Sequence, residues 1–137
     1  MADPDKAVYW CNRSIELGPE NFRANIAMQL LHLYQGDEAA AFGYARKAFA
    51  IGPFFWPALT LLRDHELRAG RYAEARTLYE KTHPELLDND NPEVYDRNYR
   101  AAIDLALVLS KTGEQERADL LLNRGLQYVH TQPSYVP

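Results

Sequence analysis

The sequence is poor in the features on which cross-linked, membrane-spanning and nucleic-acid-binding proteins depend. Its 137 residues include one cysteine, Cys11, which cannot form an internal disulfide or a zinc site built from several thiolates. No apolar run approaches the roughly 20 residues that a membrane-spanning helix needs, and no basic, apolar leader opens the chain. The formal net charge of -4 repels phosphate backbones. These absences predict a soluble, cytoplasmic protein whose partners are neither nucleic acids nor membranes.

Patterns typical of catalysis are also scarce. The Asp-His-Glu string at 64–66 lacks the second histidine that a zinc-protease helix requires, and neighbouring helical side chains point in different directions. The Asp-Asn-Asp string at 88–90 resembles the start of a calcium loop, but Tyr99 stands where the closing glutamate belongs. We therefore predict no catalytic, cofactor or metal site. An enzyme remains the alternative that a pocket with paired histidines and carboxylates would favour.

What the sequence does contain is a regular series of helix breakers. Gly36, Gly70 and Gly113 each separate two helix-like segments, and an alanine follows each glycine five residues later. Gly36 and Gly70 are 34 residues apart, and the Gly-Pro pairs at 18–19 and 52–53 have the same spacing. Gly70 and Gly113 are 43 residues apart, so the last interval holds nine extra residues. This period predicts helix–turn–helix units.

The pattern resembles the tetratricopeptide family, whose unit is a 34-residue helix–turn–helix. Ala41, Ala75 and Ala118 match the small residue at the close crossing of the two helices in that family. Tyr79 and Leu122 match the bulky residue one turn later. The resemblance covers roughly residues 4–130, and it implies an all-α fold, a right-handed α–α superhelix of about seven helices. Departures from the family pattern stand at Asn25, Ala45, Leu59, Thr82, Ala102 and Gly125.

The units follow from this register. We predict one tetratricopeptide-like domain over 1–137, with a leading helix at 4–17, repeats at 22–55, 56–89 and 92–130, and a tail at 131–137. The third repeat is expected to begin with a long helix, because Asn91-Pro92 combines a helix cap with a proline in the first turn. Residues 83–91 are expected to form a polar loop with a short turn at 84–87. Leu122 and Val129 are expected to pack on the preceding helix. Similar units occur in bacterial multidomain regulators.

The resemblance implies a concave groove, lined by the first helix of each unit, in which an extended peptide or a partner helix lies. The implied lining is apolar at one end and basic at the other, so a protein or peptide partner with acidic groups beside apolar anchors would fit. Ile26 and Leu30 occupy the places of the lysine and asparagine with which one branch of the family grips chaperone tails, so we predict no chaperone clamp. The implied groove residues are Arg23, Ile26, Leu30, Leu33, Tyr34, Thr60, Asp64, Leu67, Arg68, Arg100, Ile103, Leu107 and Lys111.

Two further segments are candidate interfaces. The leading helix is half a unit, and its apolar edge includes Val8 with Trp10 nearby. We expect that the chain was cut from a longer protein or that self-association covers this edge. The aromatic residues Phe54, Phe55 and Trp56 cannot all face inward on a tight turn, so they either fill a gap between helices or anchor a partner. The sequence thus favours a non-catalytic interaction scaffold, and a homodimerisation module of a larger regulatory protein is the alternative.

Overall fold

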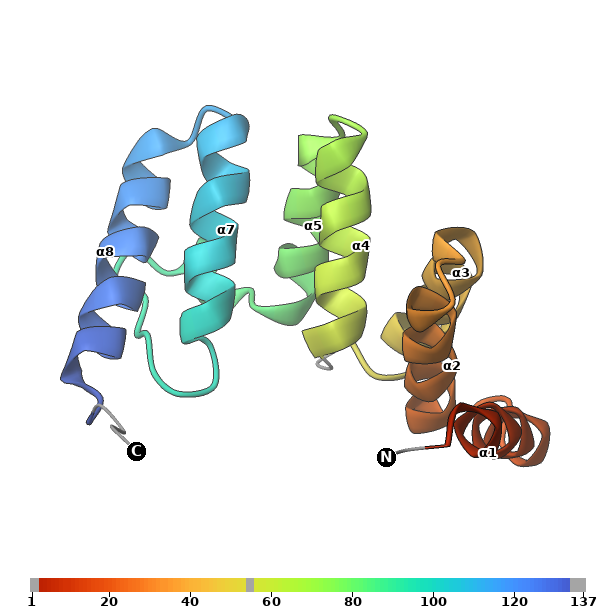
Figure 1. Cartoon of the computed structure of the whole chain (residues 1–137). Coiled ribbons are helices and arrows are strands. Elements are labelled where there is room, and N and C mark those ends of the chain that lie inside the picture. Colours follow the sequence, from red (N-terminus) through yellow and green to blue (C-terminus); the bar gives the residue numbers. More distant parts are fainter. Residues whose placement is uncertain (1–2, 54–55, 134–137) are drawn as a thin grey trace. The chain divides into compact units, whose positions relative to one another are not determined.

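The computed structural model describes residues 3–53 and 56–133, and within them every regular element is a helix (Figure 1). Helices make up 77% of the structure, and the described residues contain no strand, which confirms the all-α prediction. They form eight helices, one more than expected, because the turn expected at 84–87 is a short helix. The helices are α1 Pro4–Leu17, α2 Phe22–Tyr34, α3 Glu38–Ile51, α4 Trp56–Arg68, α5 Tyr72–Thr82, α6 Glu85–Asp88, α7 Tyr99–Lys111 and α8 Gln115–Thr131.

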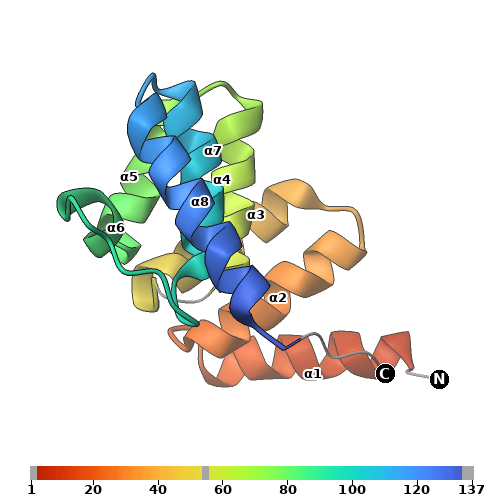
Figure 2. The same ribbon diagram turned by 90° about the vertical axis from the view of Figure 1, so that its left-hand side faces the viewer.

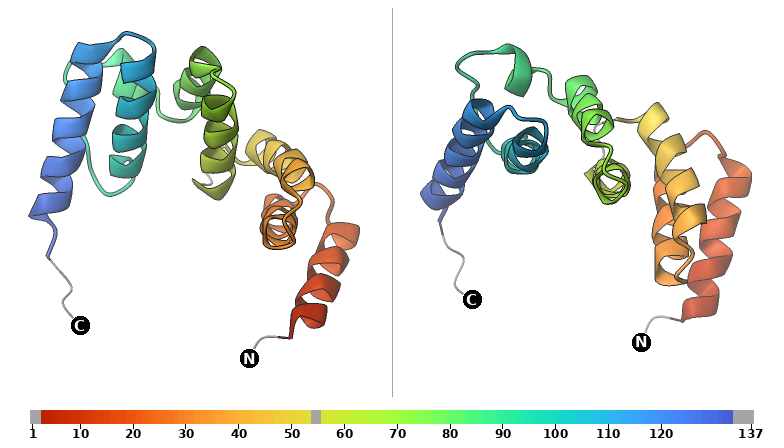
Figure 3. Two further views of the ribbon diagram at one scale, coloured as in Figure 1. Left: turned by 45° about the horizontal axis from the view of Figure 1, so that its top comes forward. Right: turned by 90° about the horizontal axis from the view of Figure 1, so that it is seen from above.

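The helices form two compact units, residues 1–65 and residues 66–137. In the first unit, called unit 1, α2 packs on α3 and on α1. In the second, called unit 2, α7 packs on α8 and on α5, and Figure 3 shows α7 and α8 as an antiparallel pair. The predicted single domain and superhelix concern the arrangement of these units, and they stay predictions.

The three glycine breaks end their helices in the same way. Within the described residues, only Gly36, Gly70 and Gly113 have positive φ, at 79°, 72° and 84°. Glycine lacks the Cβ that makes this left-handed region costly for other residues. In each turn the next amide donates to the carbonyl oxygen five residues earlier, which satisfies an acceptor at the helix end. These bonds join Asp37 to His32 at 2.9 Å, Arg71 to Glu66 at 2.9 Å and Glu114 to Leu109 at 3.0 Å.

A second kind of helix end also recurs. Gly18 and Gly52 close α1 and α3 with φ of -145° and -140°, and each precedes a proline. His83, also followed by proline, closes α5 with φ of -137°. A residue before proline is driven out of the helical region, so the proline sets the end of the helix. The two Gly-Pro ends were predicted from the sequence, and the third agrees with the polar loop expected to begin at residue 83.

The alanines after the glycine turns lie in the core. Ala41 and Ala75 are fully buried and Ala118 is nearly so. In α3 a row of three residues, called the alanine row, has 0% exposure. Because α2 covers the face of α3, side chains larger than alanine in this row would hold the two helices apart. The alanine row consists of Ala41, Ala45 and Ala48.

In the α7–α8 pair a glycine allows the two helices to approach closely. Gly125 is buried, and a Cβ placed on it would lie 2.6 Å from Cγ1 of Ile103 and 3.5 Å from the carbonyl oxygen of Tyr99. No methyl group fits at that distance without displacing Ile103. Gly125 departs from the alanine of the family pattern because Ile103 of α7 occupies the place of a Cβ.

Polar side chains inside unit 1 tie its turns to its helices. The Asn25 side chain is fully buried and donates to the carbonyl oxygens of Pro19 and Asn21 at 2.9 and 2.8 Å. The buried Gln29 donates to the carbonyl oxygen of Pro57 at 3.0 Å, which joins α2 to the first turn of α4. Asn25 thus departs from the large residue of the family pattern and satisfies backbone acceptors in the α1–α2 turn instead.

The prediction of a long helix beginning at Pro92 is wrong. The helix α7 begins at Tyr99, and residues 92–95 have no regular structure. The buried Asn98 donates to the carbonyl oxygen of Glu93 at 3.0 Å and accepts from the amide of Tyr95 at 2.9 Å. These bonds fold the segment into a turn, and the side chain of Pro92 is buried against the protein. Packing of the segment therefore outweighs the local cap signal.

The glycine turns make a direct prediction about stability. Gly70→Ala should lower the free energy of unfolding by about 1 kcal/mol, because a Cβ is strained at φ 72° although no atom lies within 4 Å of it. Gly43→Ala is the matched control in the middle of α3, where the Cβ also meets no atom, and it should raise stability by about 0.5–1 kcal/mol. Urea denaturation followed by circular dichroism measures both changes. Equal effects of the two substitutions would contradict the role given to the turn.

Candidate functional site

The Asp-His-Glu string at 64–66 forms no shared site. Asp64 accepts hydrogen bonds from Arg63 at 3.0 and 2.7 Å. The Glu66 carboxylate accepts from Arg71 at 2.5 Å, and the ring of His65 stacks on an α3 phenylalanine with centroids 4.0 Å apart. As expected for adjacent helical residues, each side chain thus has its own neighbour. Over the residues that the structure describes, no group of three histidine, cysteine or carboxylate side chains is placed to hold a metal ion.

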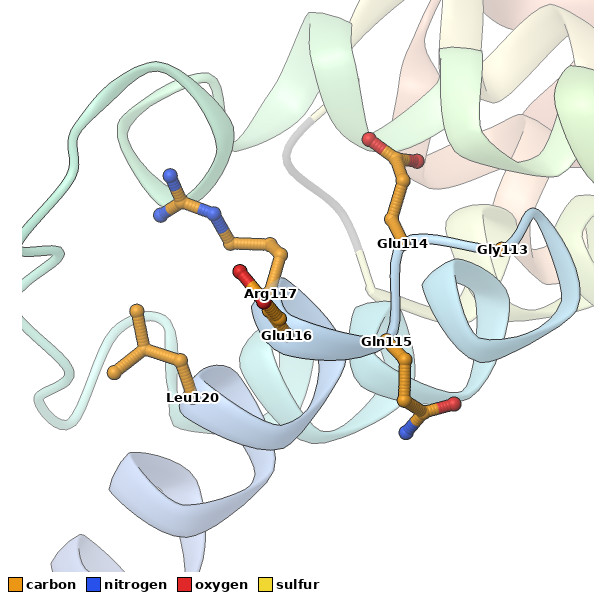
Figure 4. A pocket seen from close by; sticks show the side chains of 6 residues that line it. All are labelled: Gly113, Glu114, Gln115, Glu116, Arg117 and Leu120. Atoms are coloured by element: carbon orange, nitrogen blue, oxygen red, sulfur yellow. The ribbon is translucent and has the colours of Figure 1, made fainter.

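A hollow of about 560 Å³ lies at the first turn of α8 (Figure 4). Figure 4 shows Glu114 and Gln115 pointing to opposite sides of the turn, and Arg117 reaching away from both. Glu114 accepts from two nitrogens of Arg76 at 2.8 and 3.0 Å, and this hydrogen-bonded guanidinium lowers the pKa of the Glu114 carboxyl. Glu114 and Arg117 thus bind neighbouring parts of unit 2, so these lining side chains of the hollow hold the fold together. Its lining residues are Gly113, Glu114, Gln115, Glu116, Arg117 and Leu120.

Two arginines of α8 hold the polar loop that precedes α7. Arg117 donates to the carbonyl oxygen of Asn89 at 2.6 Å. Two turns further along, Arg124 donates to the carbonyl oxygen of Pro92 at 2.5 Å and to Oδ1 of Asn91 at 2.6 Å. The loop therefore runs beside α8, as Figure 2 shows. The sequence predicted a polar loop, but not that α8 would bind its backbone.

In unit 1 the implied groove residues of α2 include an exposed apolar group. Tyr34 is 81% exposed, and Leu30 and Leu33 are exposed beside it at helical spacing. Ile26 is buried and belongs to the core, whereas Arg23 is exposed one turn before it. The three exposed side chains Leu30, Leu33 and Tyr34 are called the α2 apolar face.

The implied groove residues of α4 are more enclosed. Thr60 is half-buried, and its hydroxyl donates to the carbonyl oxygen of Pro57 at 3.2 Å. Asp64 and Leu67 are half-buried as well, and Arg68 is exposed. Thr60 and Asp64 thus have structural partners within unit 1, and they offer less free surface than the residues of α2.

In unit 2 the implied groove residues of α7 lie on one exposed side of the helix. Leu107 is 52% exposed, Ile103 is half-buried, and Arg100 and Lys111 are exposed toward the two ends. A hollow of about 340 Å³ separates this side of α7 from α8. It is lined by Ile103, Ala106, Leu107, Ser110, Gln115, Ala118, Asp119 and Leu122.

The helix α8 supplies apolar residues that the groove prediction missed. Leu122, Leu126 and Val129 are exposed, although Leu122 and Val129 were expected to pack on α7. Only the neighbouring row with Leu121 and Gly125 is buried there. The spacing of four and then three residues places the exposed row on one side of α8 and was visible in the sequence. Ile103, Leu107, Leu122, Leu126 and Val129 are together called the α7–α8 apolar surface.

The candidate interface residues have different environments. Trp10 is 63% exposed, and its ring lies nearly perpendicular to that of Tyr9, with centroids 5.1 Å apart. Val8 is half-buried in α1, and Trp56 is half-buried at the first residue of α4. Phe54 and Phe55 lie outside the described residues. Among these positions, Trp10 therefore presents the large free surface.

The sequence matches no protein-family model, and no match to a curated protein is found. The tetratricopeptide resemblance therefore stays a prediction. Among the described helices, none is both long and apolar enough to cross a membrane.

The Arg76–Glu114 contact predicts a pH effect on stability. Because folding lowers the pKa of Glu114, the unfolded chain binds more protons as the solution turns acidic, and the contribution of this pair is lost as pH falls below the ordinary glutamate value. The pair is partly exposed, so Glu114→Gln should cost about 0.5 kcal/mol at neutral pH and almost nothing in acid. Denaturation at neutral and acidic pH measures the difference. Glu116→Gln, an exposed neighbour on α8, is the control, and an equal loss in that variant would contradict the assignment.

Proposed function

We propose that this chain is a non-catalytic protein–protein interaction module that binds a helix or an extended peptide of a partner. The observation that carries the proposal is the α7–α8 apolar surface. Ile103, Leu107 and Leu122 come from two adjacent helices and line a hollow, and the exposed row of α8 continues beyond it with Leu126 and Val129. A contiguous apolar patch of this kind is typical of an interaction site, whereas single exposed leucines are ordinary.

The shape of the surface suits an amphipathic partner helix. The hollow beside Leu107 has small residues at its base, Ala106 and Ala118, so one apolar side chain of the partner can enter between α7 and α8. Neighbouring anchors spaced by three or four residues would then lie along Leu122 and Leu126. Each square ångström of apolar surface removed from water contributes about 25 cal/mol, so a few such anchors would supply most of the binding energy.

Two cations on α7 favour acidic groups in the partner, and the one carboxylate that lines the hollow, Asp119, accepts a hydrogen bond from Gln115 at 2.8 Å. Arg100 and Lys111 are exposed toward opposite ends of α7, on the side that carries Leu107. Arg100 also donates to the hydroxyl of Tyr99 at 3.0 Å, which holds its guanidinium near the protein surface. A partner with carboxylates beside its apolar anchors would meet these cations, which increases the association rate and sets the orientation.

The tetratricopeptide resemblance supports the same reading. In that family the first helices of successive units present their exposed sides to one groove, and α2 and α7 hold that place in the register. We extend the proposal to a right-handed superhelix in which the α2 apolar face also contributes to binding. The resemblance to bacterial multidomain regulators further suggests a cytoplasmic scaffold within a larger protein.

The proposal predicts that one charge on the surface abolishes binding without unfolding the protein. Peptides are first selected by display against the whole chain, and the affinity of a selected peptide is measured by calorimetry. Leu107→Glu should weaken it at least about tenfold, because the hollow would then hold a desolvated carboxylate. Circular dichroism should be unchanged, since Leu107 is 52% exposed.

The matched control is Asn123→Glu, which adds the same charge at an exposed position on α8 outside the α7–α8 apolar surface. Leu30→Glu tests the α2 apolar face in the same way. If all peptides bind Leu107→Glu and Leu30→Glu as tightly as they bind the unmodified chain, these faces are not the interaction site.

A further inference from the structure

The helices α1 and α3 share the same sequence register and the same kind of C-terminal end. Gly18 and Gly52 are 34 residues apart, precede a proline and have nearly the same backbone angles. In this register Ala7, Cys11 and Ser14 of α1 correspond to the alanine row of α3. That row has 0% exposure under α2, whereas Ala7 and Ser14 are exposed and Cys11 is half-buried. The side of α1 that a helix covers in α3 is therefore open.

This open side carries large apolar residues as well as small ones. Trp10 and Leu17 are 63% and 71% exposed, and they alternate along it with Ala7 and Ser14. No residue of α1 is buried, although Val8 and its neighbours toward α2 are half-buried. An indole with this exposure is costly in water, and tryptophan is the residue type that most often anchors protein interfaces.

A hollow lies on the same side, one turn after Trp10. It has a volume of about 470 Å³, and its lining comes from α1, α2 and the turn between them and includes the small residues Ser14, Ala24 and Ala27. The open side thus presents a projecting ring and, one helical turn away, a recess. The residues around the recess are Ser14, Leu17, Gly18, Asn21, Arg23, Ala24 and Ala27.

The Trp10 ring and the recess beside Ser14 lie on one surface, so two copies related by a two-fold axis can each insert a ring into the recess of the other. In such a pair, if one residue contacts another across the interface, the second contacts the first in return. When two copies of α1 lie antiparallel with the axis opposite residue 12, Trp10 faces Ser14 of the second copy, and Ala7 faces Leu17. Both contacts pair a large side chain with a small one, which allows the helices to approach closely.

We propose that this side of α1 binds a second copy of the chain in an antiparallel pair, with Trp10 of each copy in the recess beside Ser14 of the other. Asp3 precedes α1 two helical turns before Trp10, on the side that carries this ring, and Arg23 stands at the opposite end, beside the recess. An antiparallel pair brings Asp3 toward Arg23 of the second copy and places Lys6 opposite its Gly18. The α7–α8 apolar surface takes no part, so pairing and peptide binding are tested separately.

The test measures the solution mass of the whole chain by sedimentation equilibrium from about 1 µM to about 1 mM. The unmodified chain should form dimers within this range. Trp10→Ala should weaken dimerisation at least about tenfold, since it removes the projecting ring. Ser14→Trp should do the same by filling the recess. Tyr34→Ala, which removes an aromatic ring that is 81% exposed on α2, should leave the dimer intact.

A mixing experiment provides the decisive control. Trp10→Ala keeps an open recess and Ser14→Trp keeps its Trp10 ring, so an equimolar mixture should form a mixed dimer through one ring and one recess. Circular dichroism measures the helical content of each variant. If Trp10→Ala or Ser14→Trp fails to fold, Leu17→Ser replaces it in the mass measurement, where it should also weaken dimerisation.

Three results would overturn the proposal. The first is a monomer at every concentration, which would leave this side of α1 to a different partner. The second is a dimer that Tyr34→Ala dissociates and Trp10→Ala does not. The third is a mixture of folded variants that stays monomeric.

Discussion

Close approach of the two helices within a pair is the constraint on which the rest of the structure depends. In unit 1 it requires the alanine row of α3, and in unit 2 it requires Ala118 and Gly125 of α8. Small residues at the crossing allow the two helix backbones to approach closely. The larger apolar residues beside this contact are buried where a third helix covers them. Where no third helix covers them, they stay exposed. Exposed apolar surface is thus a consequence of the same packing that stabilises each pair.

Polar contacts determine the conformation of the segment that precedes α7. The residues inserted before α7 do not extend that helix, because Arg117 and Arg124 bind carbonyl oxygens of the loop and Asn98 folds the segment before Tyr99. Hydrogen bonds to charged groups contribute more than neutral ones, and here they satisfy backbone acceptors that no helix pairs. The Arg76–Glu114 contact adds a link between α5 and the start of α8. Unit 2 therefore combines an apolar contact between α7 and α8 with hydrogen bonds that hold the loop and α5 beside them.

Much of this fold could be predicted from local signals in the sequence. The glycines at the three turns were recognisable because positive φ favours glycine, and Asp3 caps α1 as its place before Pro4 suggests. The start of α7 was not predictable in this way, since Arg124 contacts the loop from 32 residues away. The resemblance implied groove residues on α2, α4 and α7, and it did not include the exposed row of α8, because an apolar row on a helix does not reveal whether another helix covers it.

The central claim is that apolar rows left open by helix pairing are binding surfaces. The most direct test is methyl NMR of leucine-labelled protein during titration with a selected peptide. The account predicts that the signals of Leu107, Leu122 and Leu126 shift in proportion to occupancy, while those of the buried Leu105, Leu109 and Leu121 move little. A shift confined to Leu120, the leucine that lines the hollow at Glu114 and Arg117, with the exposed leucines unchanged, would contradict it.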